Sequence, residues 1–546
     1  MEKLTQNYSQ DWPKTNRTSL LSPFYVAFVG VVLIVFLYEL WFRNSRAYKL
    51  LANMPTPPRL PLIGHAHHVI GLTSREIMRT CLDYYRKYGE TVWAVNGHRI
   101  VVFITNPADI EIILSSSEHL EKSEEYRFFK PWFRDGLLIS KGAHWQHHRK
   151  MIAPTFHQSI LKSFMPKFVE YSENVVKKFS KLTGKEIDVH DYMSETTVEI
   201  LLSTVMGVKN LPSGSECANY AKAVVDMCDI IHRRQIQLNY HFDILFKLTK
   251  LNTKLNELLS SILALTQRVI TERIKNFNVE SDGIFDTKDA NESKVKKQDG
   301  FRDDLDDIDE NDVGTKRRLA LLDAMLEMSK NPNNKWTEKD ITDEVNTLMF
   351  EGHDTTSAGS SFLLCLLGIH KDVQDKVYEE QKAIFGNDMN RPCTFADTID
   401  MHYLERVIKE TLRLYPPVPI IARKVNTDVR LASGPYTIPN GSTVVIGQYA
   451  VHRNSNTYKD PEKFNPDNFL PEEVSKRHYY SYIPFSAGPR SCVGRKYAML
   501  MLKVLISTII RRYSVHSNIT EPDFELQGDI ILKLSKGFNV AFTLRT

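Results

Sequence analysis

The stretch that decides the fold is PFSAGPRSCVGRKYAM, residues 484–499. It contains one cysteine, Cys492, between Gly488 and Gly494 and two residues after Arg490. Glycines let the backbone approach a flat macrocycle where a Cβ atom would clash. A helix that begins just after the cysteine would point backbone N–H groups at the sulfur and favour its thiolate form. The arginine can pair with a carboxylate through its fork of donors. Together these features are typical of a cysteine thiolate that ligates haem iron.

Five residues of this stretch match the pattern F-x-x-G-x-R-x-C-x-G without a gap: Phe485, Gly488, Arg490, Cys492 and Gly494. The pattern resembles the haem-binding signature of the cytochrome P-450 superfamily. The resemblance implies haem b as the cofactor and Cys492 as its axial iron ligand. It also implies that Arg490 pairs with a haem propionate and that Phe485 shields the ligand from water. Thiolate ligation favours cleavage of the O–O bond.

A second stretch, TLMFEGHDTTSAGSSF at residues 347–362, changes from apolar helical residues to glycine, acid and threonine. Glycine within a helix costs about 1 kcal/mol relative to alanine, and threonine hydroxyls compete for backbone carbonyls, so we expect a local distortion or groove. The stretch resembles the oxygen-binding helix of the superfamily, which implies Thr355 as the proton-relay hydroxyl and Asp354 as its acid. Glu351 shares a helix face with Thr355. In family 4 a glutamate here is implied to form an ester with a haem methyl; the alternative is an ionised glutamate that reaches a water or an arginine.

Two more patterns resemble places where the superfamily binds the haem propionates. Trp145 and Arg149 form W-x-x-x-R, which is similar to the motif of the C helix. Arg423 ends the string YPPVPIIAR, where relatives have a propionate ligand. The resemblance therefore implies that these three residues bind the cofactor.

The pair Glu410 and Arg413 resembles the E-x-x-R motif of the superfamily's K helix. Residues three apart share a helix face, so the acid and the base can form a buried pair. The resemblance implies a structural role for this pair, on the thiolate side of the haem. Asn468 stands where many relatives have arginine, which puts the usual third member of the network in doubt.

The N-terminal region predicts a membrane anchor. Residues 20–42 are almost wholly apolar, with Glu39 the only charge, and reach the roughly 20 residues that a bilayer-spanning helix needs. The tail at 1–19 contains acids and no small-residue cleavage site follows the apolar run, which favours a retained anchor over a signal peptide; the alternative is a buried core helix. The prolines of 43–64 favour a stiff, extended linker. We expect a haem-thiolate catalytic domain at 65–546, and the flanking basic residues weakly favour a cytosolic body.

The remaining periodicity predicts a mainly α fold with a minor antiparallel β-sheet region. The resemblance implies that this is the cytochrome P-450 fold, here with a single N-terminal transmembrane helix. Apolar residues recur at helical spacing over Ser159 to Phe179, Asn252 to Phe277 and Tyr403 to Leu414. Turn residues between apolar runs predict three β-hairpins, at 91–104 around Asn96-Gly97, 436–446 around Asn440-Gly441, and 530–544 around Gly537.

Composition excludes several classes of protein. The six cysteines are scattered without a C-x-x-C pair, which argues against a disulfide framework or a zinc site and fits a reducing compartment. The net charge is only +4 and no basic tract is interleaved with aromatics, so we expect no nucleic-acid partner. Residues 278–318 are acidic and poor in apolar side chains, which predicts a disordered surface insertion.

Longer strings, such as YRFFKPWFRDGLLIS and MFEGHDTTSAGSSF, are similar to the insect G subfamily of family 4. The resemblance implies an oxidative decarbonylase that converts long-chain fatty aldehydes to cuticular hydrocarbons and releases carbon dioxide. The alternatives are a fatty-acid omega-hydroxylase or a xenobiotic-oxidising monooxygenase. Remoter ones are a non-oxygenase thiolate-haem protein and a haem-free membrane interaction protein.

The resemblance also implies the partners and the location of such an enzyme. They are a long-chain lipid substrate, NADPH-cytochrome P-450 reductase, cytochrome b5 and the endoplasmic reticulum membrane. Basic residues on the thiolate side, Lys150, Arg495 and Lys496, are candidates for reductase docking; the alternative is an ordinary solvated face.

Overall fold

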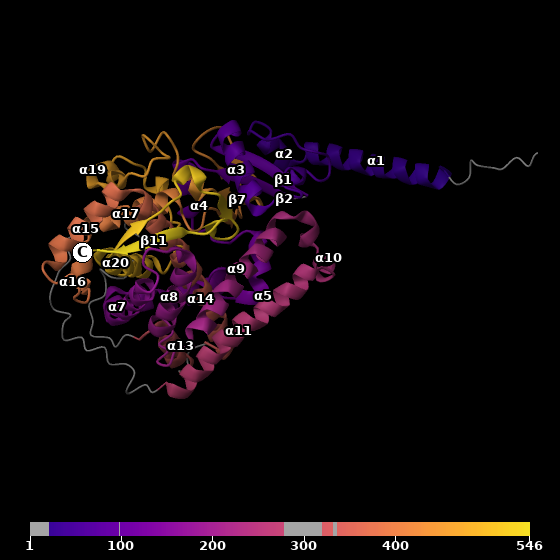
Figure 1. The fold of residues 1–546 in the computed structure, drawn as a ribbon. Helices are drawn as coiled ribbons and strands as arrows, with labels where there is room; N and C mark the ends of the chain where they lie inside the picture. Colours follow the sequence, from indigo (N-terminus) through magenta and orange to yellow (C-terminus); the bar gives the residue numbers. More distant parts are fainter. Residues whose placement is uncertain (1–20, 98, 278–318, 331–335, 546) are drawn as a thin grey trace, which may run out of the picture.

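The structure is a computed structural model that describes residues 21–97, 99–277, 319–330 and 336–545. The predicted tail at 1–19 and the predicted insertion at 278–318 lie outside the described residues. Helices dominate, and the strands are short (Figure 1). The fold is mainly α with small sheets, as the sequence predicts.

The α-helices have the following bounds: α1 Leu21–Asn44, α2 Arg46–Leu51, α3 Ser74–Tyr88, α4 Pro107–Leu114, α5 Lys130–Phe133, α6 Gly142–Ile152, α7 Gln158–Ser180, α8 Val189–Thr204, α9 Gly214–Ile236, α10 Asp243–Lys247, α11 Lys250–Asn276, α13 Leu321–Ser329, α14 Glu338–Ile369, α15 Lys371–Phe385, α16 Phe395–Asp400, α17 His402–Leu414, α18 Gln448–Val451, α19 Pro471–Val474 and α20 Arg495–Arg512. The three helices predicted from periodicity correspond to α7, α11 and α17, with ends that differ by one or two residues.

The strands have the following bounds: β1 Thr91–Asn96, β2 Arg99–Ile104, β3 Glu186–Asp188, β4 Ile421–Lys424, β5 Val429–Arg430, β6 Thr437–Ile438, β7 Thr443–Ile446, β8 Tyr513–His516, β9 Leu526–Gly528, β10 Leu532–Leu534 and β11 Asn539–Leu544. The main sheet has the order β1-β2-β7-β4. All pairs are antiparallel except β2 with β7, which is parallel and aligns Val101 with Thr443.

Of the three predicted hairpins, only the first forms. β1 pairs with β2 in register from Thr91 opposite Ile104 to Asn96 opposite Arg99. In the second prediction both strands exist, but β6 pairs with β5 and β7 joins the main sheet. In the third, β10 pairs with β9, whereas β11 lies between β3 and β8. The turn residues mark a change of chain direction, but the wider sheets offer both strands other partners.

Helix α14 runs through the centre of the molecule (Figure 1). It packs against α8, α9, α11, α17 and α20. Its last turns, from Phe362 to Gly368, are buried and apolar. A helix surrounded on all sides can be apolar all round. The opposite end carries the acids and threonines, so the polar chemistry is confined to the first two-thirds of α14.

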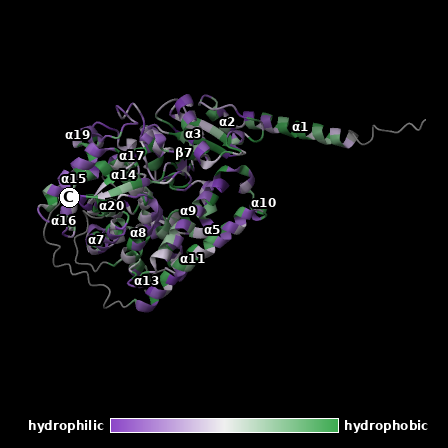
Figure 2. Ribbon diagram, in the orientation of Figure 1, coloured by the Kyte–Doolittle hydropathy of each residue, from purple (hydrophilic) through white to green (hydrophobic). Residues whose placement is uncertain are grey.

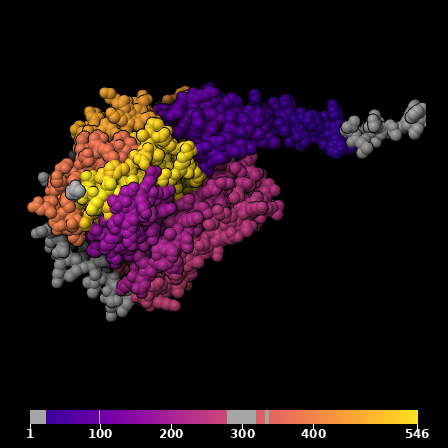
Figure 3. Space-filling model, viewed as in Figure 1, coloured from indigo at the N-terminus to yellow at the C-terminus, as the bar shows by residue number. Residues whose placement is uncertain are grey.

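Helix α1 extends away from the body (Figures 1 and 3) and is mostly hydrophobic along its length (Figure 2). Its segment Pro23–Asn44 is the one helix in the described part of the chain that is long and apolar enough to cross a membrane, and none of its most apolar window is buried. The alternative of a buried core helix does not fit this exposure. Near its end, Arg59 Nη1 donates to Glu39 Oε2 at 3.0 Å.

The proline-rich segment at 43–64 differs from the predicted free strut. It begins with α2, in which Leu51 is fully buried. Trp93 then donates its backbone N–H to Pro55 O and its indole N–H to Met54 O, both at 3.0 Å. The segment is therefore extended only in part and is bonded along β1, which fixes the exit of α1 from the body.

Candidate active site

The loop around Cys492 is held by its own backbone. Cys492 N–H donates to Phe485 O at 2.9 Å. Helix α20 begins at Arg495 with Gly494 as its N-cap, so the predicted helix start after the cysteine is present. Burial and the negative charge of Glu351 raise the pKa of the Cys492 thiol to about 11, although the hydrogen bond from Gly494 N–H opposes both. Coordination to a metal ion removes the proton from a thiol, so the loop suits a ligand that binds metal.

Gly488 is required by the path of the loop. Its φ of +69° lies in the left-handed region, and a Cβ atom there would lie 1.9 Å from Leu114 O. The glycine therefore lets the loop pass against the end of α4, and its predicted role at the cofactor stays a prediction. Gly494 does lie at the cavity wall, where a Cβ atom would make ordinary contact with Cys492 Sγ at 4.0 Å.

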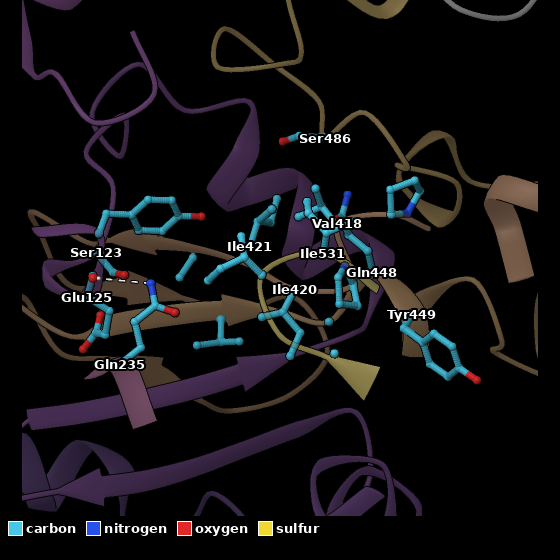
Figure 4. Close-up of a pocket in the computed structure, with 18 of the residues that line it drawn as sticks. Ser123, Glu125, Gln235, Val418, Ile420, Ile421, Gln448, Tyr449, Ser486 and Ile531 are labelled. Carbon is cyan, nitrogen blue, oxygen red and sulfur yellow. Dashed lines mark hydrogen bonds between the residues drawn. The ribbon is translucent and has the colours of Figure 1, made fainter. Parts of the chain in front are cut away.

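A cavity of about 580 Å³ opens above Cys492. The sulfur is exposed to it, and Phe485 belongs to its wall. Figure 4 shows apolar side chains of the wall together, among them Val418, Ile420, Ile421 and Ile531. At another side Gln235 donates to the Glu125 carbonyl at 3.5 Å (Figure 4). The wall thus combines a sulfur ligand with a largely apolar interior.

Helix α14 supplies the wall opposite the sulfur. Glu351, Gly352 and Thr355 line the cavity. The sequence predicts a local distortion or a groove here. Helix α14 continues without a break, and Thr355 Oγ1 donates to Glu351 O at 2.6 Å. Because Gly352 and Thr355 lie in the cavity wall, a groove is present and not a break in the helix. A Cβ atom at Gly352 would lie 2.8 Å from Leu201 Cδ1, so α8 packs directly against this turn. Burial raises the pKa of Glu351 to about 7.

Asp354 faces away from the cavity. It is fully buried and does not belong to the cavity wall. Its Oδ1 lies 2.8 Å from Lys533 Nζ in β10. Burial raises the pKa of Asp354, but the Lys533 charge outweighs this and holds it below its usual range. The neighbouring His353 is also buried, and neither ring nitrogen has a hydrogen-bond partner among the described residues.

Basic side chains gather at the edge of the cavity beside the cysteine loop. Arg149 Nη1 donates to Ser491 O at 2.8 Å. Arg490 donates to Ser140 O and Leu138 O and lies 4.6 Å above the ring of Trp145. Burial lowers the pKa of Arg490 to about 9.

Two further cations complete this group. Arg423 is buried, and its Nη2 has no hydrogen-bond partner among the described residues. Lys122 is buried and lines the cavity, although its sequence context gave no signal for it. Burial, together with the charges of Arg423 and Arg490, places the pKa of Lys122 well below its usual range. Buried cations need an anion, and the two propionates of haem supply that charge. The residues therefore fit haem.

The predicted structural pair is formed, and its other partners lie in residues 452–468, before the cysteine loop. Arg413 Nε donates to Glu410 Oε2 at 2.7 Å, and both side chains are fully buried. Arg413 also donates to the carbonyls of His452, Pro461 and Lys463. Asn468, whose role was in doubt, donates its Nδ2 to Glu410 Oε1 at 3.0 Å. An amide thus provides the third contact to the carboxylate.

The family model described as cytochrome P-450 matches residues 54–542. The chain belongs to the cytochrome P-450 family. It is 60% identical to cytochrome P-450 4g1 of Drosophila melanogaster over 547 residues, which covers 100% of this chain and 98% of the relative. It is 46% identical to cytochrome P-450 4g15 of the same species, over 97% of this chain and 98% of the relative. It is 34% identical to human cytochrome P-450 4V2, over 94% of each chain.

These relatives place this cytochrome P-450 in the G subfamily of family 4. It is a haem-containing monooxygenase, and proteins of the family draw electrons from redox partners such as NADPH-cytochrome P-450 reductase. The apolar helix α1 is consistent with the membrane-bound character of family 4.

Proposed function

We propose that this monooxygenase is an oxidative decarbonylase of long-chain fatty aldehydes. In the balanced reaction, one aldehyde, one dioxygen and two reducing equivalents with two protons give a hydrocarbon one carbon shorter, carbon dioxide and water. The observation that carries the proposal is the distribution of charge in the cavity. Lysine and arginine in the described part of its wall are confined to Lys122, Arg149 and Arg490, the group that faces the cofactor.

The rest of the wall suits a neutral chain. Away from the cysteine loop the cavity is lined by residues such as Val69, Ile77 and Met78, and its acidic side chains there are those of Glu90, Glu125 and Asp529. A fatty acid would bring a carboxylate that needs a buried cation. An aldehyde brings no charge, so the described wall favours the aldehyde over the carboxylate. The cavity also includes Pro57 and His65, just after the anchor, which gives a lipid a short path from a bilayer.

Haem bound in this cavity would supply dioxygen activation. The residues around it would hold and orient the haem and deliver protons. Cys492 Sγ is proposed as the iron ligand, Phe485 as its shield, and Trp145, Arg149, Arg423 and Arg490 as propionate partners. Thr355 Oγ1 holds a proton on the opposite side of the cavity. Asp354, one residue earlier, keeps a carboxylate next to Lys533 and is proposed to pass protons toward that hydroxyl after a side-chain rotation. Glu410 and Arg413 are proposed as the structural pair that orders the chain before the cysteine loop, where Arg413 donates to three backbone carbonyls.

We also propose that Glu351 is esterified to the haem. Its carboxyl lines the cavity, and its pKa of about 7 means that burial disfavours the charged form. An ester with a haem methyl would remove that charge and fix the cofactor. Its C–O bond replaces one methyl C–H bond and the carboxyl O–H bond, and dioxygen, the oxidant of the monooxygenase reaction, would take up the two electrons and two protons released. Glu351→Ala should leave the haem extractable by acidified organic solvent, whereas the haem of the unmodified enzyme should stay with the protein. Extractable haem in the unmodified enzyme would end this part of the proposal.

The decarbonylase proposal is tested with membranes that contain the enzyme and NADPH-cytochrome P-450 reductase. Octadecanal is the substrate, and octadecanoic acid is run in parallel. We expect heptadecane and carbon dioxide from the aldehyde and little oxidation of the acid. Terminally hydroxylated acid as the main product would instead support the omega-hydroxylase. Oxidation of unrelated apolar compounds with equal efficiency would support the xenobiotic-oxidising alternative.

The proposed location is the endoplasmic reticulum membrane, with one span at α1 and a cytosolic catalytic domain. Lys150 is exposed and Arg495 and Lys496 are partly exposed beside the start of α20. They are proposed as part of the docking surface for the reductase and for cytochrome b5. Replacing all three by glutamine should slow reductase-driven turnover at low salt, where surface charges are least screened. Unchanged turnover there would remove the docking role.

A further inference from the structure

A cluster of ligand-type side chains lies where α6 meets the first turn of α14. His144 and His148 are one helical turn apart on α6, and Asp340 is in the first turn of α14. One ligand atom from each of the three lies within 4.8 Å of the others. His148 Nε2 and Asp340 Oδ1 are 4.0 Å apart. None of the three residues lines the cavity, so the cluster is separate from the proposed active site.

Each histidine has one ring nitrogen held by a hydrogen bond. His148 Nδ1 lies 2.6 Å from Oε1 of the buried Glu344, and His144 Nε2 lies 3.1 Å from Asp135 O. Carboxylate and carbonyl oxygens are acceptors, so in both rings the bonded nitrogen carries the proton. The other nitrogen, Nε2 of His148 or Nδ1 of His144, then offers a lone pair. This arrangement, in which an acceptor fixes the tautomer of a histidine, is typical of metal ligands in proteins.

The two carboxylate oxygens of Asp340 also have different partners. Its Oδ2 accepts from the backbone N–H and the hydroxyl of Thr337, at 2.9 and 2.6 Å, and caps α14. Its Oδ1 is the oxygen that faces His148. Each of the three side chains therefore brings one ligand atom, an imidazole nitrogen or a carboxylate oxygen, to within 4.8 Å of the other two.

The surroundings hold the buried ring of His148 in place and favour a bound cation. The ring of His148 stacks on Trp336 at 4.4 Å and on His144 at 3.9 Å. Asp343 and Asp135 lie nearby and both accept from Lys339, at 2.8 and 3.0 Å. Arg134 lies 4.0 Å from Asp343, and Lys130 lies 3.9 Å from Asp135. The four acids of this corner, which are Asp135, Asp340, Asp343 and Glu344, outnumber these three cations.

We propose that His144, His148 and Asp340 bind one divalent ion of the zinc type and thereby tie α6 to α14. Two imidazoles and a carboxylate are a ligand set that zinc accepts, with water in the fourth position. Zinc ligands at about 2.0–2.1 Å in a tetrahedron lie about 3.3 Å from one another. His144 and Asp340 are the more accessible of the three, so their side chains can close the remaining distance. Because α6 also carries Trp145 and Arg149, a bound ion would stabilise the helix beside the cofactor.

Zinc binding to the purified, haem-loaded full chain tests this proposal without any measurement of activity. The protein is treated with a chelator and then equilibrated with zinc chloride in a competing chelator of known affinity. Zinc per chain is counted by elemental analysis, which distinguishes it from haem iron, and the thermal midpoint of unfolding is recorded with and without zinc. We expect one zinc per chain, a higher thermal midpoint with zinc, and no comparable effect of magnesium.

Variants decide whether the ion occupies this cluster. His144→Ala and Asp340→Asn should each weaken zinc binding at least about tenfold, and Asp340→Asn keeps an oxygen for the helix cap. His478→Asn is the matched control, because it removes an exposed histidine far along the chain and should leave zinc binding unchanged. Equal zinc binding by His144→Ala, Asp340→Asn and the unmodified chain would overturn the proposal. Failure of the unmodified chain to retain zinc would overturn it too.

Discussion

The polar groups of helices α17 and α14 differ in how they are hydrogen-bonded. On α17, Arg413 donates to both oxygens of Glu410 and to three backbone carbonyls, and both side chains are fully buried. On α14, both ring nitrogens of the buried His353 lack a hydrogen-bond partner among the described residues. The raised pKa of Glu351 shows a carboxyl whose charge is poorly compensated.

This difference separates side chains that hold the fold from side chains that take part in the reaction. A fully bonded buried network fixes one geometry, as an iron ligand requires. Groups with spare bonding capacity can exchange protons or take new partners, as the oxygen side requires. Removing a member of the Glu410–Arg413 network should therefore lower both the stability of the fold and the haem content. Removing a group on α14 should change chemistry and leave the fold intact.

The largest expected effect is that of Arg413→Ala. It leaves the carboxylate of Glu410 buried without its cation, a change that costs about 3–5 kcal/mol. We expect a much lower free energy of unfolding and loss of haem, measured by denaturant unfolding and by haem content per chain. Arg406→Ala on the same helix is the control, since its pair with Asp467 is largely exposed and is worth about 0–1 kcal/mol. Equal losses of stability and of haem in the two variants would contradict the structural role of the Glu410–Arg413 network.

Thr355→Ala tests the reacting side. The hydroxyl bonds only to the carbonyl of its own helix, so its loss should change the free energy of unfolding by less than about 1 kcal/mol. We expect a larger share of NADPH electrons to end in hydrogen peroxide, with less product per NADPH consumed. Thr347→Ala is the control: that hydroxyl makes the same kind of bond, to Asp343 O, but does not line the cavity. Unchanged coupling in Thr355→Ala would rule out the relay.

The smallest effect is expected at Asn468. Asn468→Ala removes one of several donors to Glu410, so about 1 kcal/mol of stability should be lost. Asn468→Asp should cost more, because it places a second carboxylate beside the first. Both stability costs are measured as a change in the denaturant midpoint of unfolding, in samples with equal haem content. If the aspartate variant were as stable as the unmodified enzyme, Asn468 would not belong to the holding network.

Local sequence patterns predicted the parts of the site that depend on local geometry. The start of α20 after Cys492, the bonded pair three residues apart on α17, and the first hairpin all follow from spacing along one segment. The family resemblance added Trp145 and Arg149, which lie in the cavity wall.

The features that were missed depend on contacts between distant segments. β7 aligns with β2, more than three hundred residues earlier, and no turn signal reports such a pairing. Gly488 is required by Leu114 O in α4, and Asp354 meets Lys533 in β10. Lys122 lies outside every motif, and only burial in the cavity wall shows its place among the basic residues. Sequence spacing carries no information about these contacts.

We propose that Cys492 ligates the haem iron as a thiolate. The reduced, carbon-monoxide-treated difference spectrum tests this most directly, on the unmodified enzyme and on Cys492→Ser. We expect the long-wavelength Soret band of thiolate ligation in the unmodified enzyme and its loss in the variant. A folded, haem-loaded enzyme without that band, or a Cys492→Ser variant that keeps it, would contradict thiolate ligation by Cys492.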